Sequence, residues 1–265
     1  MGLKLSVWRW IHRHRRQPLV ARLARLCKNI HRASEHPGYD VMRNGERDAL
    51  ARTMPTAAPV LFDVGANVGD WSAMALGVCP TAIIHAFEIN PPTAALLAAR
   101  YSTDCRVTVH PFGLAASSGS AELFAYAGEA SVLSSLRVAL HSHVQASRNS
   151  VAVRTGDDVC HELRVEKIDF LKIDAEGADF EVLSGFNEML TAGRIACLQF
   201  EHEGGRYLRD FHDFLTPKGY VIGKLYANYV DFRPHSAELE HFLGPNYIAV
   251  PVSRDRLITD LRNGW

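Results

Sequence analysis

The segment that constrains the fold most is residues 61–71, LFDVGANVGDW, where an apolar run leads into a glycine-rich turn and then into a helical pattern. Gly65 and Gly69 allow the backbone to turn sharply and to approach a ligand closely, where a Cβ atom would collide. The start of the helix offers free N–H groups and the positive end of a dipole, which suit a carboxylate. This order of strand, turn and helix predicts an α/β fold that binds a ligand at the turn.

From residue 59 onward, short β-rich apolar runs alternate with helical stretches. The expected strands are 60–62, 82–87, 106–110, 168–173, 195–200, 220–225 and 247–250, and the expected helices among them are 68–78, 93–101, 179–183 and 207–216. Such alternation is typical of a mostly parallel sheet with helices on both faces. Two further β-like runs, 121–125 and 151–154, flank a polar region at 131–149 that we interpret as a lid or an insertion.

The charge is balanced overall, with 29 basic and 29 acidic residues, but it is not balanced along the chain. Residues 1–34 hold nine Lys or Arg and no acid, which leaves 20 basic and 29 acidic residues from Glu35 onward. A hydrophobic content of 47% excludes a disordered chain. No apolar run approaches the roughly 18–20 residues of a membrane span, and the five scattered cysteines are typical of a reducing compartment. We therefore expect a cytoplasmic protein.

Residues 1–33 form a basic segment with a pattern of its own. Leu19, Leu23, Leu26 and Ile30 recur at helical spacing, while the cations fall on other faces. Such a helix can lie on the anionic inner face of a membrane, pack on the domain or on a second subunit of a homo-oligomer, or contact nucleic acid, which we favour least. Prolines at 55 and 59 suggest a boundary, so we expect a helical extension over 1–55 and a catalytic domain over 56–265.

Polar residues that follow the first two strands are candidates for holding a cofactor. If the ligand were a dinucleotide, the carboxylate of Asp63 would have to face its negatively charged pyrophosphate. Asp63 fits better as a partner for the ammonium group of S-adenosylmethionine, either directly or through a water molecule. Glu88 ends the second strand, where a carboxylate can accept hydrogen bonds from both hydroxyls of a ribose. An adenine would lie near Gly113 and Leu114, after the third strand. The expected cofactor-binding residues are Asp63, Gly65, Asn67, Gly69, Glu88, Asn90, Gly113, Leu114 and Asp174.

Titratable residues end the fourth and fifth strands at the same crevice. Asp174 and Glu176 could orient the cofactor, bind Mg²⁺ or remove a substrate proton. His202 is our first candidate for a general base because it is the only histidine beside a site motif, and Glu201 and Asp174 are the alternatives. Holding a nucleophile in line with the methyl group can itself supply most of the rate.

Taken together, these segments resemble the FkbM family of S-adenosylmethionine-dependent O-methyltransferases, which includes enzymes that methylate sugar hydroxyls and a macrolide hydroxyl. The resemblance runs from about residue 44 to residue 247, through the motifs NGE, FDVGANVG, FEINP, LKIDAEG and QFE. It implies a class I methyltransferase fold, with a Rossmann-like sheet of seven strands of which the last is antiparallel. It also implies a hydroxylated acceptor, and we expect a sugar of a glycan or glycolipid. The chain departs from the family pattern at Asn90, close to where a proline is usual, and at Asp179, where a glutamate is usual.

Other functional classes are less consistent with these motifs. A nucleic-acid methyltransferase that acts on an amino group should carry Asn-Pro-Pro-Tyr or Asn-Pro-Pro-Phe after the fourth strand, where this chain has Asp-Ala-Glu at 174–176. An NAD(P)-dependent oxidoreductase should carry the G-x-G-x-x-G fingerprint, which does not match the turn at 65–69. A non-catalytic, membrane-associated scaffold with a vestigial cofactor site stays open, although Asp63 and Glu88 count against it.

Overall fold

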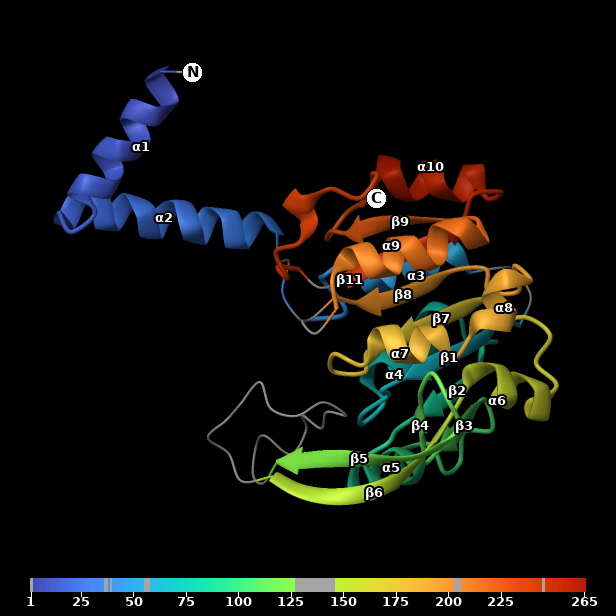
Figure 1. Ribbon diagram of the computed structural model, residues 1–265. Helices are drawn as coiled ribbons and strands as arrows, with labels where there is room; N and C mark the ends of the chain where they lie inside the picture. The colour runs from blue at the N-terminus through green and yellow to red at the C-terminus, as the bar shows by residue number, and fades with distance from the viewer. Residues whose placement is uncertain are drawn as a thin grey trace.

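One twisted sheet runs through the body of the molecule, and a helical arm projects from it (Figure 1). The computed structural model describes residues 2–35, 38, 40–54, 58–126, 146–202, 206–244 and 246–265. The arm consists of α1 (Gly2–His14) and α2 (Pro18–Glu35). Most of the polar region expected to be a lid or insertion lies outside the described residues.

Within the described residues, the main sheet has eight strands in the order β10-β9-β11-β8-β7-β1-β2-β3. β11 is antiparallel to both of its neighbours, whereas the five strands from β8 to β3 run parallel. This arrangement confirms the class I methyltransferase fold. The strand count differs from the expected seven, because β10 adds a short antiparallel edge strand beside β9. The strands are β1 (Val60–Val64), β2 (Ile83–Phe87), β3 (Val107–His110), β7 (Phe170–Ile173), β8 (Leu198–Glu201), β9 (Tyr220–Leu225), β10 (Val230–Phe232) and β11 (Asn246–Pro251).

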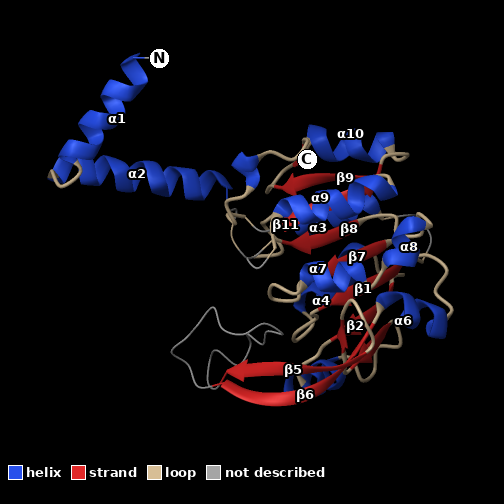
Figure 2. Ribbon diagram, viewed as in Figure 1, coloured by secondary structure: helices blue, strands red, loops and turns tan. Residues whose placement is uncertain are grey.

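Helices cover both faces of this sheet (Figure 2). Successive side chains of a strand point to opposite faces, so Leu61 and Phe62 of β1 enter two different cores. The core that contains Leu61 is covered by α3 (Glu46–Thr53), α4 (Asp70–Val78), α5 (Pro91–Arg100) and α10 (Asp255–Asn263). The core that contains Phe62 is covered by α6 (Gly156–Leu163), α7 (Asp179–Ser184), α8 (Asn187–Thr191) and α9 (Leu208–Leu215).

A second, smaller sheet flanks the β3 edge. Its strands are β4 (Gly113–Leu114), β5 (Gly119–Tyr126) and β6 (Ala146–Arg154), in the order β4-β6-β5. Two 3₁₀ turns, η2 (Thr216–Lys218) and η3 (Ala237–Leu239), complete the described elements. β5 and β6 contain the two additional β-like runs that the sequence predicted.

The arm is attached to the body at the last residue of α2. The carboxylate of Glu35 accepts hydrogen bonds from Lys224 Nζ at 2.6 Å and from the hydroxyl of Tyr226 at 3.1 Å. Lys224 lies on β9 and is almost completely buried. Among the described residues, no helix is both long and apolar enough to span a membrane.

Two neighbouring histidines, one on β2 and one on β3, predict that the stability of the fold depends on pH. His85 Nδ1 lies 3.1 Å from His110 Nε2, and His110 stacks on Phe87. Burial lowers the pKa of His110 from 6.5 to about 4, so on acidification the unfolded chain takes up the proton first. The free energy of unfolding should therefore fall as the pH drops from about 6.5 to about 4.

Equilibrium urea unfolding across this pH range measures that dependence. His110→Phe should weaken it, because phenylalanine keeps the stacking and cannot titrate. His161→Phe, at an exposed histidine of α6, is the matched control and should leave it unchanged. Equal pH dependence in both variants would contradict this assignment.

Candidate active site

The turn after β1 brings the ends of β1 and β7 into direct contact. Gly65 has a φ of 77°, and a Cβ atom there would lie 1.8 Å from the carbonyl oxygen of Asp174. Gly69 has a φ of 86°, and its Cβ atom would collide with the side chains of Tyr101 and Leu97. Gly65 therefore permits the contact between strand ends, whereas Gly69 permits α4 to pack against α5.

A narrow slot of about 90 Å³ opens beside this turn, at the carboxyl ends of the parallel strands. We call it the cofactor slot. Ligands of open α/β sheets bind in this position, where the strand order reverses. Eight of the residues predicted from the sequence line it: Gly65, Asn67, Glu88, Asn90, Gly113, Leu114, Asp174 and Glu176.

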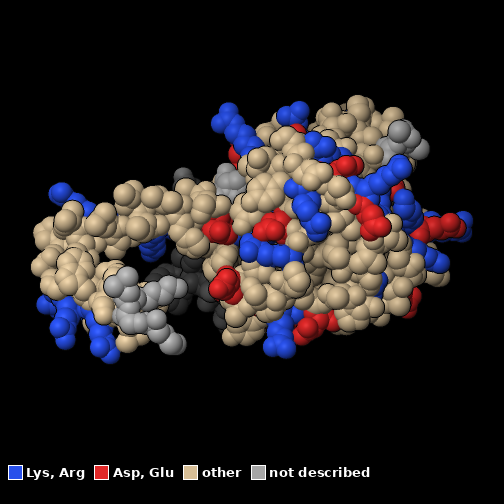
Figure 3. Space-filling model, turned by 90° about the horizontal axis from the view of Figure 1, so that it is seen from above, with Lys and Arg blue, Asp and Glu red and all other residues tan. Residues whose placement is uncertain are grey.

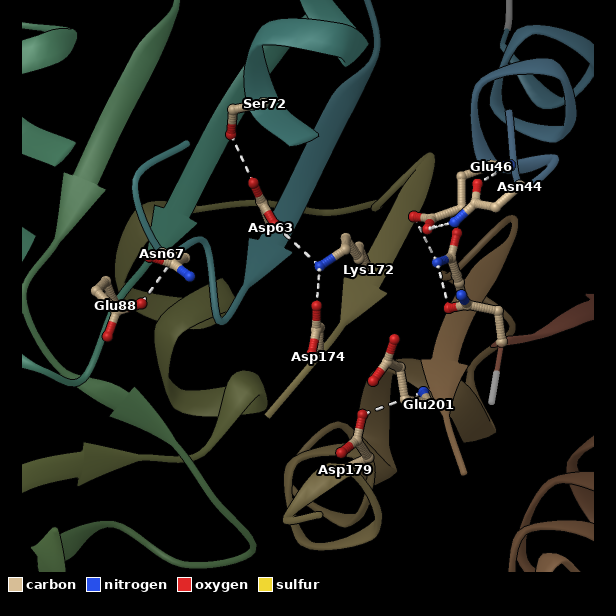
Figure 4. A network of polar contacts seen from close by, with 12 residues as sticks. Asn44, Glu46, Asp63, Asn67, Ser72, Glu88, Lys172, Asp174, Asp179 and Glu201 are labelled. Carbon is tan, nitrogen blue, oxygen red and sulfur yellow. Dashed lines mark hydrogen bonds and ion pairs between the residues drawn. The ribbon is translucent and has the colours of Figure 1, made fainter. Parts of the chain in front are cut away.

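Glu88 is fixed at the wall of the slot by two backbone donors. One carboxylate oxygen accepts the N–H of Asn67 at 2.8 Å, and the other accepts the N–H of Asn90 at 2.7 Å (Figure 4 shows the first). Burial raises the pKa of Glu88, although these two N–H groups oppose the change. The carboxylate is thus held in one orientation before any ligand arrives.

Two residues of the slot have a left-handed backbone although neither is a glycine. Asn67 has a φ of 50° and Glu176 a φ of 49°. The left-handed conformation costs roughly 1–2 kcal/mol for most residues, and asparagine tolerates it best. Such strain is concentrated at ligand sites in proteins, which is consistent with a binding role for both turns.

A buried lysine, Lys172, lies between two of the predicted carboxylates (Figure 4). Its Nζ atom is 3.0 Å from Asp174 Oδ2 and 3.9 Å from Asp63 Oδ1, and Asp63 also accepts a hydrogen bond from the Ser72 hydroxyl at 2.7 Å. Burial lowers the pKa of Lys172, but the carboxylates of Asp174 and Asp63 outweigh it and raise the pKa overall. Asp63 is fully buried below the turn and does not line the cofactor slot.

A second cavity, of about 220 Å³, adjoins the cofactor slot. The two share Gly65, Asn67 and Asp174, so Asp174 lies at their junction. The second cavity is lined further by Val41, Asn44, Glu46, Ala66, Val68, Asp70, Trp71, Lys172, Glu201 and Asn246. Carboxylates outnumber cations in this lining.

Glu46 reaches this cavity from the start of α3, far away in the sequence. Its carboxylate accepts hydrogen bonds from Asn44 Nδ2 at 2.5 Å and from Gln199 Nε2 at 2.8 Å, and Gln199 also donates to Asn246 at 2.9 Å. Among the described residues, the buried indole N–H of Trp71 has no hydrogen-bond partner. The cavity therefore combines fixed acceptors with an unused donor, a combination that suits hydroxyl groups.

His202 does not line either of these cavities, although Glu201 lines the second one. Adjacent residues of an extended chain point to opposite sides, which explains the difference. The His202 ring packs against Phe242 with centroids 4.5 Å apart and the ring planes tilted by 31°, and its Nε2 atom lies 3.1 Å from the carbonyl oxygen of Arg206. Burial lowers the pKa of His202, although the Arg206 carbonyl and Glu240 oppose the change.

Asp179 joins the end of β8 to the turn after β7. Its carboxylate accepts the backbone N–H of Glu201 at 3.2 Å and that of Gly177 at 3.3 Å. Burial, and then the charge of Asp174, raise the pKa of Asp179 to about 8. Its side chain thus connects two loops of the site.

The predicted Mg²⁺ site finds no support in this arrangement. The described part of the chain contains no group of three or more His, Cys, Asp or Glu side chains that could hold a metal ion. The carboxylate of Asp174 already has a cationic partner, because the ammonium group of Lys172 lies 3.0 Å from its Oδ2 atom.

Sequence reasoning missed Lys172, Glu46 and Trp71. Lys172 carried a signal, because a charged residue inside an otherwise apolar strand needs a buried partner. Glu46 was noted only as part of the NGE motif, and nothing local indicated its contact with Gln199, which spans 153 residues of sequence. Trp71 was noted only as part of the glycine-rich motif.

Comparisons with known proteins agree with this geometry. The model of the methyltransferase FkbM domain matches residues 63–222, which is more than half of the chain. The hexuronic acid methyltransferase AglP of Haloferax volcanii is 32% identical over 153 residues, which cover 55% of this chain and 58% of AglP. The 2-O-methyltransferase NoeI of Sinorhizobium fredii is 27% identical over 175 residues, which cover 59% of this chain and 71% of NoeI.

A matching solved structure is much less similar to this chain in sequence than these two relatives are. The crystal structure of a putative rRNA methylase from Clostridium thermocellum has a TM-score of 0.46 and 8% identity, with 78% of this chain and 95% of that chain covered. The family match, by contrast, contains the turn after β1, the strand-end carboxylates and most of the sheet. The chain belongs to the FkbM family of methyltransferases.

Proposed function

We propose that this protein transfers the methyl group of S-adenosylmethionine to a hydroxyl group of a sugar in a glycan or glycolipid. The observation that carries this proposal is the junction of two cavities at Gly65, Asn67 and Asp174. One cavity has the lining expected for the cofactor, and the other offers hydrogen-bond partners for hydroxyls. The printed names of two relatives, hexuronic acid methyltransferase and 2-O-methyltransferase, support a sugar acceptor.

The charges around the slot favour S-adenosylmethionine over a dinucleotide. Asp63, Asp174 and Glu88 supply three carboxylates, against the single ammonium group of Lys172. S-adenosylmethionine carries a sulfonium and an ammonium group against one carboxylate, whereas NAD⁺ brings a pyrophosphate. Like charges brought together in a partly buried site cost free energy, so the slot should select the cationic ligand.

We assign the ribose to Glu88 and the adenine to the wall formed by Gly113 and Leu114. Both oxygens of Glu88 are held in place, and a carboxylate of fixed orientation can accept hydrogen bonds from two neighbouring hydroxyls. A Cβ atom on Gly113 would lie 2.4 Å from Ile89 Cδ1, so the glycine keeps this wall flat. Asp63 does not contact the cofactor in this assignment; it supports the slot from below through its hydrogen bond with Ser72 and its ion pair with Lys172.

The acceptor hydroxyl is proposed to enter the second cavity and to meet the methyl group at Asp174. Bound S-adenosylmethionine supplies an electrophilic methyl group on sulfur. The hydroxyl oxygen forms a bond to that carbon as the carbon–sulfur bond breaks, which yields a methyl ether, S-adenosylhomocysteine and one proton. Asp174 is the proposed proton acceptor, because it lines both cavities and Lys172 fixes its orientation.

Glu201 and Glu46 are proposed to position the acceptor through its other hydroxyls. Both line the second cavity, and Glu46 is itself held by Gln199. His202 has a structural role in this proposal, since its ring packs against Phe242 away from both cavities. The segment that carries Glu46 falls within the extension expected over 1–55, so we propose that α3 functions as part of the catalytic domain.

Methyl transfer from labelled S-adenosylmethionine to a panel of methyl glycosides, neutral and uronic, tests the function. Mass spectrometry of the products should locate the label on a sugar oxygen. Label in an oligonucleotide would favour the nucleic-acid enzyme, whereas cofactor binding without transfer to any glycoside or cellular glycan would favour the scaffold.

Glu88→Gln should weaken the binding of S-adenosylhomocysteine. The loss of charge-assisted hydrogen bonds to the ribose costs about 2 kcal/mol, which is about thirtyfold in affinity. Isothermal titration calorimetry measures this change. Glu162→Gln, at an exposed carboxylate of α6, is the matched control and should bind like the parent protein. Equal affinity in both variants would remove Glu88 from the ribose site.

Asp174→Asn should lower the turnover number about a hundredfold or more, the usual range for loss of a general base. Glu201→Gln should instead raise the KM for the acceptor, with a smaller effect on turnover. His202→Gln serves as the comparison, with both constants within a few-fold of the parent protein. Steady-state kinetics separates these outcomes, and a loss of turnover confined to His202→Gln would make His202 the base.

A further inference from the structure

The arm formed by α1 and α2 leaves the body without packing along it (Figure 1). Its large apolar side chains are exposed, with Trp8 at 77% and Leu19 at 70% of their full accessible surface. Isolated helices shorter than about 12–15 residues are only marginally stable in water, and α1 has 13 residues. An apolar face of this kind marks a binding surface, because it gains stability only when something covers it.

The exposed apolar residues of α2 form one stripe. Leu19, Leu23, Leu26 and Ile30 follow one another at intervals of three and four residues, which places them on one side of the helix. In α1, Trp10 is exposed as well. The arm therefore presents leucine, isoleucine and tryptophan side chains to its surroundings.

The charge of the arm identifies the kind of surface that it fits. Residues 1–34 contain nine Lys or Arg and no acid. In Figure 3, the arm shows Lys and Arg side chains, while the Asp and Glu side chains lie over the body. A helix with an apolar stripe, tryptophans and a purely basic polar face is typical of peptides that lie in the interface of an anionic bilayer.

Other occupants explain these features less well. Nucleic acid would use the cations but not the leucine stripe. If two arms paired along their stripes, the nine Lys and Arg residues of one arm would come close to the nine of the other, and these like charges would repel. On the described part of the body, exposed apolar residues are scattered: Ile83 lies on β2, Leu96 on α5, and Val252 in the turn after β11, so no matching stripe is evident there.

The root of the arm lies at the same edge of the sheet as the proposed active site. Glu35 is bound by Lys224 near the carboxyl end of β9. In the sheet, Tyr247 of β11 pairs with Lys224 on one side and with Phe200 of β8 on the other, so Lys224 and Phe200 lie at the same height along their strands. Glu201 of the second cavity follows Phe200 directly. A surface that holds the arm therefore lies on the side of the molecule toward which both cavities open.

We propose that α1 and α2 bind the surface of an anionic lipid bilayer, with the apolar stripe inserted among the headgroups and the Lys and Arg side chains paired with lipid phosphates. The arm then holds the carboxyl edge of the sheet close to the bilayer. A methyltransferase attached in this way is suited to acceptors linked to lipid, a consequence that rests on the proposed function.

Cosedimentation of the full-length protein with vesicles tests the proposal. Vesicles of equimolar phosphatidylcholine and phosphatidylglycerol should bind the protein, and vesicles of phosphatidylcholine alone should bind it far less. Raising the ionic strength should release part of the protein from the anionic vesicles, because salt screens the exposed charges. Equal binding to both vesicle types, or to neither, would overturn the proposal.

Two variants with the same change in charge separate insertion from simple attraction. Leu23→Glu adds an acid to the stripe, whereas Ala24→Glu adds one at a neighbouring exposed position outside it. Ala24→Glu should weaken binding to anionic vesicles about fivefold through charge alone. Leu23→Glu should weaken it about a hundredfold, because the variant also loses a leucine side chain that would be buried in the bilayer. Equal losses in the two variants would exclude insertion of the stripe.

Two further measurements identify the other occupants. Light scattering after gel filtration would reveal a dimer that Leu23→Glu dissociates, and such a dimer without vesicle binding would assign the stripe to a second copy. A DNA duplex that both variants release equally, again without vesicle binding, would assign the arm to nucleic acid. Calorimetry with S-adenosylhomocysteine should give the same affinity for both variants, so failure of the arm proposal is distinguishable from failure of the proposed function.

Discussion

The ammonium group of Lys172 joins the carboxyl ends of β1 and β7. Burying a lysine without a partner costs several kcal/mol, so its position requires the carboxylates of Asp63 and Asp174. Asp63 in turn holds Ser72 of α4, and Gly65 lets the two strand ends meet. The turn that forms the cofactor slot and the strand end that forms the second cavity are thereby fixed relative to one another.

This charge arrangement also gives the site its selectivity. More carboxylates than cations surround the junction of the two cavities, and the lysine is already paired. A ligand with a sulfonium and an ammonium group reduces the repulsion among these carboxylates, whereas a pyrophosphate increases it. The same excess should make the second cavity more favourable for hydroxyl groups than for added negative charge. The site and the basic arm therefore have opposite electrostatic characters within one chain.

Much of the fold could be predicted from the sequence because it is encoded locally. The run at 61–71 contains a strand, a turn and a helix start in order, and the structure has all three there. The edge strand β10 was missed because three residues carry too little periodicity. α10 was missed as well, although Leu257 and Leu261 have helical spacing and pack in the core.

The candidate site was harder to predict where it depends on distant contacts. Most of the expected cofactor-binding residues line one slot, because strands that run parallel end at the same edge of a sheet. Glu46 joins the site only through the packing of α3, which no local pattern indicates. His202 was favoured for its chemistry, but it follows β8 directly and packs against Phe242, whereas Glu201 at the end of β8 lines the second cavity.

Calorimetric titration of the full-length protein with S-adenosylhomocysteine, with NAD⁺ as the comparison, tests the central claim most directly. The account predicts that S-adenosylhomocysteine binds at one site per chain and that NAD⁺ gives no measurable heat of binding. Binding of NAD⁺, or of neither ligand, would contradict the assignment of the slot beside Gly65 and Glu88 to S-adenosylmethionine.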